Sequence, residues 1–168
     1  LRPSHFFVHL KQNNLETLTS LVDYHIDREI KNSKFPTHLE GNERYRHVLE
    51  TFVDDFAKMA AKFEDEYIFC WLDWDGDNIL MDGAIIDYGS IRQFGLFHHE
   101  YRYDDVERFS TNILEQKQKV KHMIMTFAQV IDYVTSKKKE RLDSYKTHWS
   151  AKLFDKKFDY YKNCNFLE

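Results

Sequence analysis

Apolar residues recur at helical spacing through most of this chain. The clearest pattern covers residues 45–63, where apolar side chains follow the i, i+3, i+4, i+7 spacing of one helix face. A second apolar face covers residues 15–31 and ends before Pro36, because the residue ahead of a proline disfavours helical geometry. Two further stripes predict a long helix over about 106–134 and a last helix from about 142. Helices therefore account for most of the predicted structure.

Polar residues stand where these helices are expected to begin. Asn13, with Glu16 three residues later, makes a capping-box pattern ahead of the helix over residues 15–31. Asn42 can cap the helix that contains residues 45–63. The first twelve residues hold a short apolar and aromatic run, which is compatible with a strand or with the lead-in to a helix.

One stretch in the middle of the chain does not follow the helical pattern. Residues 71–89 read WLDWDGDNILMDGAIIDYG, with acidic residues and glycines between short apolar runs. Asp82 and Gly83 separate two of these runs and predict a β-hairpin turn, because glycine adopts a positive φ without steric cost. The expected fold class is therefore mainly α (α+β), with long helices around a short β-hairpin.

Composition narrows the classes of protein. The length of 168 residues suits a single domain over residues 1–168. A net charge of -4 gives no support for a generic nucleic-acid-binding protein, since phosphate binding needs clustered Lys and Arg. No apolar run approaches the ~18–20 residues that span a bilayer, so no membrane partner is expected. Cys70 and Cys164 do not make a disulfide framework, which favours a reducing, cytoplasmic compartment.

The acidic stretch carries a spacing that is typical of phosphate chemistry. Asp73 and Asn78 flank four residues, and Asp87 follows across the predicted hairpin, directly before Tyr88 and Gly89. In kinase-like folds the first Asp of this pattern orients or deprotonates the attacking hydroxyl, and the Asn and second Asp hold Mg²⁺ against the nucleotide phosphates. The pattern predicts that Asn78 and Asp87 bind Mg²⁺ (or Mn²⁺) and ATP, with Asp73 as the base.

A calcium loop is the alternative metal site in the same stretch. Asp73, Asp75 and Asp77 alternate as the first three ligands of an EF-hand loop do. The next position is Asn78 instead of glycine, and the twelfth is Ala84 instead of a bidentate glutamate, which disfavours calcium. Asp75 on its own is best interpreted as an ordinary turn residue.

These motifs resemble the selenoprotein O (YdiU) family, a protein-kinase-like family of adenylyltransferases. Residues 4–10, SHFFVHL, are similar to its S-H-x-x-V segment. Its T-D-N core, followed nine residues later by D-Y-G, matches Asp77 and Asn78 with residues 87–89. The resemblance implies a protein-kinase-like C-lobe that binds ATP and transfers AMP to Ser, Thr or Tyr hydroxyls of protein substrates. Asp77 would then be the base, and Asn78 and Asp87 the metal ligands.

The chain also departs from this family. Trp71 and Leu72 stand where the family has His-Gly, and Phe7 stands where it has Arg. Asp73 occupies the place of the catalytic Asp of ordinary kinases, so phosphoryl transfer by Asp73 stays open beside AMP transfer by Asp77.

No glycine-rich loop or V-A-I-K-like lysine, which in kinase-like enzymes cover and pair the phosphates, precedes the acidic stretch. The chain is therefore expected to be the C-lobe alone, with the N-lobe removed or supplied by a partner chain. A non-catalytic pseudoenzyme or interaction fragment is the third interpretation.

Overall fold

The computed structural model describes residues 1–66, 68–70, 74–86, 91–93 and 113–167. The elements, in chain order, are α1 (Pro3–Lys11), α2 (Leu15–Lys31), α3 (Asn42–Asp65), β1 (Ile68–Cys70), β2 (Ile91–Gln93), α5 (Ile113–Ser136), the 3₁₀ helix η2 (Leu142–Thr147) and α6 (Trp149–Leu167). No helix in these ranges combines the length and the apolar composition that crossing a membrane requires.

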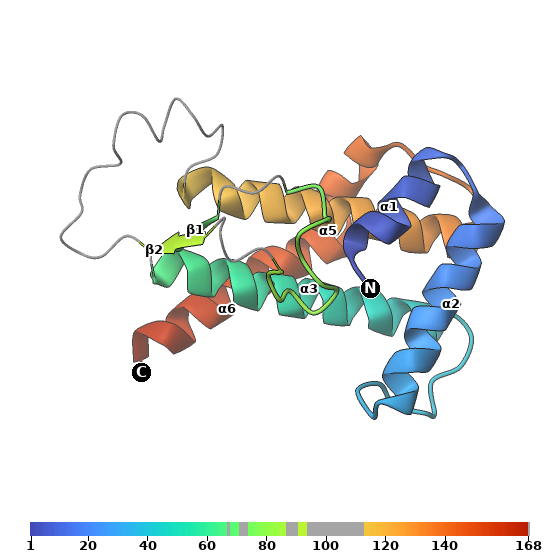
Figure 1. The fold of residues 1–168 in the computed structure, drawn as a ribbon, viewed down its shortest axis with the longest axis horizontal. Helices are drawn as coiled ribbons and strands as arrows, with labels where there is room; N and C mark the ends of the chain where they lie inside the picture. Colours follow the sequence, from blue (N-terminus) through green and yellow to red (C-terminus); the bar gives the residue numbers. More distant parts are fainter. Residues whose placement is uncertain (67, 71–73, 87–90, 94–112, 168) are drawn as a thin grey trace.

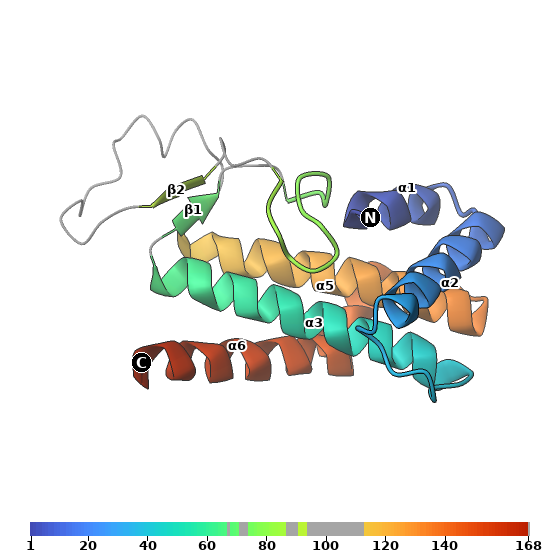
Figure 2. The same cartoon turned by 60° about the horizontal axis from the view of Figure 1, so that its bottom comes forward.

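Helix α3 is the centre of the fold. It packs against α5 and α6 and lies between them in Figure 2, and in Figure 1 α6 crosses the other two helices obliquely. Helices α1 and α2 pack against each other and against α5 at one end of this group. The short strands β1 and β2 lie near the opposite end of α3 (Figure 1).

The predicted apolar stripe of α3 is confirmed. Its buried residues recur three and four positions apart and face both flanking helices: Val48, Leu49, Phe52, Val53, Phe56, Ala57, Met59, Ala60 and Ala61. The small side chains at Ala57, Ala60 and Ala61 allow close packing between helices, while the phenylalanines fill the space between them.

Stacked and edge-on aromatic rings connect four helices. Phe52 of α3 lies 4.4 Å from the ring of Phe127 of α5, centroid to centroid, and 4.1 Å from Phe56. Phe127 meets Phe6 of α1 edge-on at 5.6 Å, and Phe6 meets His25 of α2 at 6.0 Å. We call these five residues the aromatic row. All but His25 are at most 2% exposed, so the row is the inner part of the core.

Three tyrosine–aspartate hydrogen bonds join the helices around this core. The hydroxyl groups of Tyr45, Tyr145 and Tyr161 donate to Asp23, Asp132 and Asp54, respectively, at 2.6–2.9 Å. Burial, followed by the hydrogen bond to Asp23, raises the pKa of Tyr45 to about 12, so this tyrosine stays a donor at neutral pH.

Several helix starts differ from the sequence-based expectation. Capping of α3 by Asn42 is wrong, because Asn42 is the first residue of that helix and Gly41 holds the cap position. Residues 3–11 form a helix with Pro3 in its first turn. A proline is tolerated there because N–H groups of the first turn have no hydrogen-bond partner within the helix. The cap of α2 is Asn14, whose side chain accepts the N–H of Thr17 at 3.2 Å, whereas Asn13 adopts a left-handed φ of 54°. Capping by Asn13 is therefore wrong by one residue.

The starts of the two later helices compare differently with expectation. The predicted helix start near residue 106 lies outside the described residues, and the described helix α5 begins at Ile113. The chain from Leu142 first forms η2 and becomes α-helical only at Trp149.

The expectation of a kinase-like C-lobe built around a β-hairpin is wrong. Residues 79–86 were expected to form that hairpin, yet they contain only turns and one isolated bridge between Ile79 and Ile85. The strands present, β1 and β2, are three residues each and pair antiparallel outside that segment. Because Ile79, Met81 and Ile85 are buried against helices, their apolar spacing is satisfied without a strand ladder. The fold is an all-α framework.

Replacing Phe127 by alanine tests the aromatic row. Phe127 is fully buried between Phe52 and Phe6, so F127A should lower the free energy of unfolding by about 3–5 kcal/mol. Urea unfolding followed by circular dichroism measures this change. The matched control is Val8→Ala, which removes an apolar side chain that is 48% exposed and should change stability by less than about 0.5 kcal/mol. Equal effects of the two variants would contradict the assignment of the row as the inner core.

Candidate functional site

The described part of the site predicted from sequence, Asp77 and Asn78, belongs to the loop of residues 74–86, which lies over α3 and α5 on the side away from α6 (Figure 2). Ile79, Met81 and Ile85 anchor this loop to the helical core, with exposed fractions of 0–9%. Backbone hydrogen bonds tie it to the first residues of the chain: Ser4 N–H donates to Gly76 O at 3.2 Å. Segments more than seventy residues apart thus form one unit.

Hydrogen bonds within the loop bring its two ends together. The N–H of Ile86 donates to Asn78 O at 2.9 Å, and the N–H of Leu80 donates to Ala84 O at 2.8 Å. The side chain of Asp82 accepts the N–H of Ala84 at 3.0 Å. The interpretation of Asp82 as a turn residue is confirmed by this bond.

Gly76 lets the loop approach the first turn of α1. Its φ is +91°, a left-handed value that glycine adopts readily. A Cβ atom at this position would lie 2.8 Å from Pro3 Cβ and 2.9 Å from Ser4 N. A side chain at residue 76 is therefore excluded both by backbone conformation and by space.

Asp77 is held by Ser4 of α1 and by Arg2, the residue that precedes α1. Its carboxylate lies 3.1 Å from the Arg2 guanidinium and accepts the Ser4 hydroxyl at 3.2 Å. The N–H of Asp77 donates to the Asp75 carboxylate at 2.9 Å, which makes Asp75 a turn residue, as interpreted from sequence. The Asp77 side chain is still 55% exposed, so molecules in solution can reach it.

Asn78 differs from its acidic neighbours. It is half-buried, its backbone carbonyl accepts from Ile86, and its side-chain amide has no hydrogen-bond partner among the described residues. An amide oxygen without a protein partner has the chemistry that hard cations such as Mg²⁺ prefer. Asn78 therefore fits the role of an oxygen ligand.

Two of the four predicted site residues lie outside the described residues. These are Asp73 and Asp87, and Asp87 directly follows Ile86 in the sequence. The structure therefore brings together Asp77 and Asn78 only. Within the described ranges no group of three or more His, Cys, Asp or Glu side chains is placed to hold a metal ion. For the calcium alternative, Asp75 and Asp77 are engaged in a turn and an ion pair instead.

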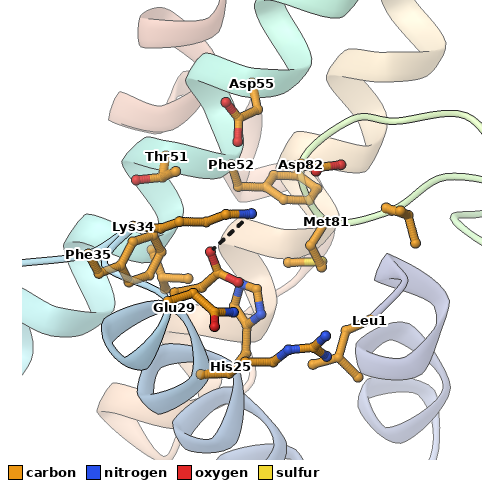
Figure 3. Close-up of a pocket in the computed structure, with 14 residues that line it drawn as sticks. Leu1, His25, Glu29, Lys34, Phe35, Thr51, Phe52, Asp55, Met81 and Asp82 are labelled. Atoms are coloured by element: carbon orange, nitrogen blue, oxygen red, sulfur yellow. Dashed lines mark ion pairs between the residues drawn. The ribbon is translucent and has the colours of Figure 1, made fainter.

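A small polar pocket lies where the loop meets α2 and α3 (Figure 3). Its volume is about 160 Å³, and Met81 and Asp82 supply its loop side. The polar side chains around it come from α2, α3 and the segment between them: His25, Arg28, Glu29, Asn32, Lys34, Thr51 and Asp55. We call this the α2–α3 pocket. Lys34 Nζ lies 3.9 Å from Glu29 Oε2 across it.

Burial changes the ionisation of two groups in the α2–α3 pocket. Burial, with smaller contributions from the carboxylates of Asp54 and Asp82, raises the pKa of Asp55 to about 6. Burial, assisted by the positive charges of Arg28 and Lys34, lowers the pKa of His25 to about 4. His25 is consequently neutral at physiological pH and acts as a member of the aromatic row.

The sequence motifs do not point to Asp55 as a site residue, but its spacing within α3 does indicate that it faces the core. Asp55 lies three residues after Phe52 and four before Met59, both of which belong to the predicted apolar stripe. A carboxylate at that spacing faces the core side of α3. It has neither a hydrogen bond nor an ion pair with a described residue, and burial of this carboxylate disfavours its charged form.

Arg2 and Ser4 were also missed as partners of the acidic loop. Nothing in their spacing indicates contact with residues 76 and 77, because that contact depends on the docking of α1.

Comparison of the chain with known protein families, with curated proteins and with solved structures gave no match in any of the three. The resemblance of the acidic loop to the adenylyltransferase family therefore stays a prediction, and the function is argued from the site itself.

Gly76→Ala tests the contact between the loop and α1. The added methyl group meets Pro3 and Ser4 at a left-handed φ, so the variant should lose about 2–4 kcal/mol of unfolding free energy. Gly41→Ala is the matched control: its φ is +57°, but a Cβ there meets no atom within 4 Å. It should lose only about 1 kcal/mol, from backbone strain. Thermal unfolding measures both, and equal losses would show that the contact is not tight.

Asp55→Asn tests the uncompensated carboxylate. The folded-state pKa of about 6 exceeds the ordinary Asp value, so ionisation of Asp55 destabilises the fold increasingly as pH rises from about 4 to 6 and fully above that range. With allowance for partial exposure, D55N should be about 1–2 kcal/mol more stable than the wild type at pH 8 and about equally stable at pH 4. Urea unfolding at the two pH values measures this, with the exposed Asp159→Asn as control. A gain in D55N that is the same at both pH values would contradict the shifted pKa.

Proposed function

We propose that this chain binds Mg²⁺-ATP at the loop of residues 74–86 and serves in adenylyl transfer to hydroxyl groups of protein substrates. The observation that carries the proposal is Asn78, whose side-chain amide is free while its backbone carbonyl is fixed by Ile86. Ile86 directly precedes Asp87, so the second predicted ligand follows the residue that is bonded to the first.

Each residue of the loop has a distinct role in this proposal. Asn78 and Asp87 supply oxygen ligands to the metal ion and position it. When bound, Mg²⁺ neutralises the phosphate oxygens that would otherwise repel a nucleophile. Ser4 and Gly76 hold the loop on α1 and thereby fix Asn78 relative to the helices.

Asp77 is the base in this proposal. A general base has to come within hydrogen-bond reach of the hydroxyl from which it removes a proton. The carboxylate of Asp77 is 55% exposed, which leaves room for a protein hydroxyl, and Arg2 and Ser4 fix its orientation. In the transfer of AMP, the hydroxyl oxygen would form a bond to the α-phosphorus of ATP and its proton would move to Asp77. The bond from the α-phosphorus to the β-phosphate would break, and pyrophosphate would leave.

A second candidate function is non-catalytic nucleotide binding. The observation that favours it is the engagement of Asp77 by both Arg2 and Ser4, because a carboxylate with two partners is less available to accept a proton. The same loop would bind Mg²⁺-ATP through Asn78 and Asp87 without promoting transfer.

A thermal shift with Mg²⁺-ATP tests the metal and nucleotide site. Binding to the native state alone stabilises it by RT ln(1 + [L]/Kd), about 2.7 kcal/mol at a ligand concentration of 100 Kd. The wild type should show this stabilisation, and Asn78→Ala and Asp87→Ala should each lose most of it. Asp82→Asn removes a carboxylate from the same loop and should retain it, because Asp82 serves the turn.

The thermal shift and a labelling experiment together give four informative outcomes. A shift that survives both N78A and D87A would overturn the assignment of the site. If the shift is present, incubation with ATP labelled at the α- or the γ-phosphate follows: α-label on protein supports adenylyl transfer, and γ-label supports phosphoryl transfer with Asp73. Binding without either label, and without any effect of Asp77→Asn on the affinity, supports the non-catalytic function.

A further inference from the structure

A larger pocket lies between α1, α5 and the turn that begins at Trp74. Its volume is about 710 Å³, within the range of about 300–1,000 Å³ that is typical of small-molecule sites. Helix α1 lies beside α5 in this region (Figures 1 and 2). We call it the lysine pocket, after Lys11, Lys119 and Lys139, which line it.

The charge of the lysine pocket is opposite to that of the chain as a whole. Three lysines line it against one carboxylate, Asp75, while the chain carries a net charge of -4. Lys139 Nζ donates to Leu10 O at 2.8 Å and to Asn13 Oδ1 at 2.9 Å, which are both neutral acceptors. Lys11 and Lys119 form no ion pair with any described residue. The positive charge of the pocket is therefore uncompensated and selects an anion.

The floor of the lysine pocket is apolar. Phe7, Leu10 and Met123 are at most 8% exposed and supply it, and the half-buried indole of Trp74 lies at the same pocket. An inorganic anion gains nothing from such a floor, whereas a ligand with a flat apolar group buries that group on it. The lining therefore fits a ligand that joins an aromatic part to an anionic part.

The position of the lysine pocket relates it to the acidic loop. Asp75, which lines the pocket, stands three residues before Asn78, and three residues of chain span at most about 11 Å. The lysine pocket therefore adjoins the loop that carries the proposed metal ligand. The identity of the ligand rests on the proposed function: its anionic part is a phosphate, and its aromatic part is a nucleobase.

We infer that the lysine pocket binds a nucleoside phosphate, with the phosphate at the lysines and the base on the floor formed by Phe7, Leu10 and Met123. This binding requires no metal ion, because lysine ammonium groups supply the charge. It provides a site for the nucleotide that is separate from the ligands of the metal.

The test is calorimetric titration of the wild type with AMP in a buffer that contains EDTA. AMP should bind, and its dissociation constant should rise with ionic strength. Adenosine and inorganic phosphate should each bind at least about tenfold more weakly than AMP, since each has only half of the contacts. Lys119→Glu should weaken AMP binding by at least about tenfold, because it replaces an attraction with a repulsion.

Lys152→Glu is the matched control. Lys152 is an exposed lysine of α6, outside the lysine pocket, and its reversal should leave the affinity for AMP unchanged. Absence of AMP binding, equal affinity for phosphate and AMP, or an unchanged affinity in K119E would each overturn the inference.

Failure of the inference and failure of the proposed function give different results. If K119E loses AMP binding but the thermal shift with Mg²⁺-ATP is unchanged in Asn78→Ala, the lysine pocket is supported and the metal site is wrong. If the shift depends on Asn78 while K119E binds AMP as the wild type does, the metal site stands and the lysine pocket is wrong.

Discussion

The ring contact between Phe52 and Phe127 is the interaction on which the remaining structure depends. It joins α3 to α5, and the edge-on contact of Phe127 with Phe6 attaches α1 to the same core. Because α1 is short and lies at one end of the bundle, it relies on this burial for its position. The first turn of α1 in turn holds Gly76 and Asp77. Aromatic packing in the core thus determines where the acidic loop sits.

The candidate site is a product of tertiary contact more than of its own motif. Asp77 and Asn78 are neighbours in sequence, yet their environments differ because only Asp77 faces Arg2 and Ser4. An ion pair between exposed groups contributes little stability, so its effect here is to orient the carboxylate. Asn78 keeps a free amide for the same reason, since no side chain of α1 reaches it.

Periodicity predicted the helices well because burial of one face is a strong local signal. The stripe of α3 and the end of α2 near Lys31 agree with expectation. The hairpin was wrong because three-residue apolar runs such as 79–81 have no distinctive period, and α3 and α1 bury them without a partner strand. Asn13 and Asn14 are chemically equivalent as caps, so only geometry could choose between them. Of the site, the sequence singles out Asn78, whose role as a metal ligand stays a prediction, but it indicates neither the ion pair of Asp77 nor the half-buried Asp55.

The acidic loop separates two pockets of unlike charge. The α2–α3 pocket has three carboxylates, those of Glu29, Asp55 and Asp82, against two cations, and its neutral His25 adds none. The lysine pocket has three ammonium groups against one carboxylate. An anionic ligand that approaches the loop is therefore attracted on the side of Trp74 and repelled on the side of Asp82. Coulomb interactions at this range are strongest where water is excluded, and both pockets are partly closed by buried apolar residues. This difference favours the approach of an anion from the side of α1 and α5.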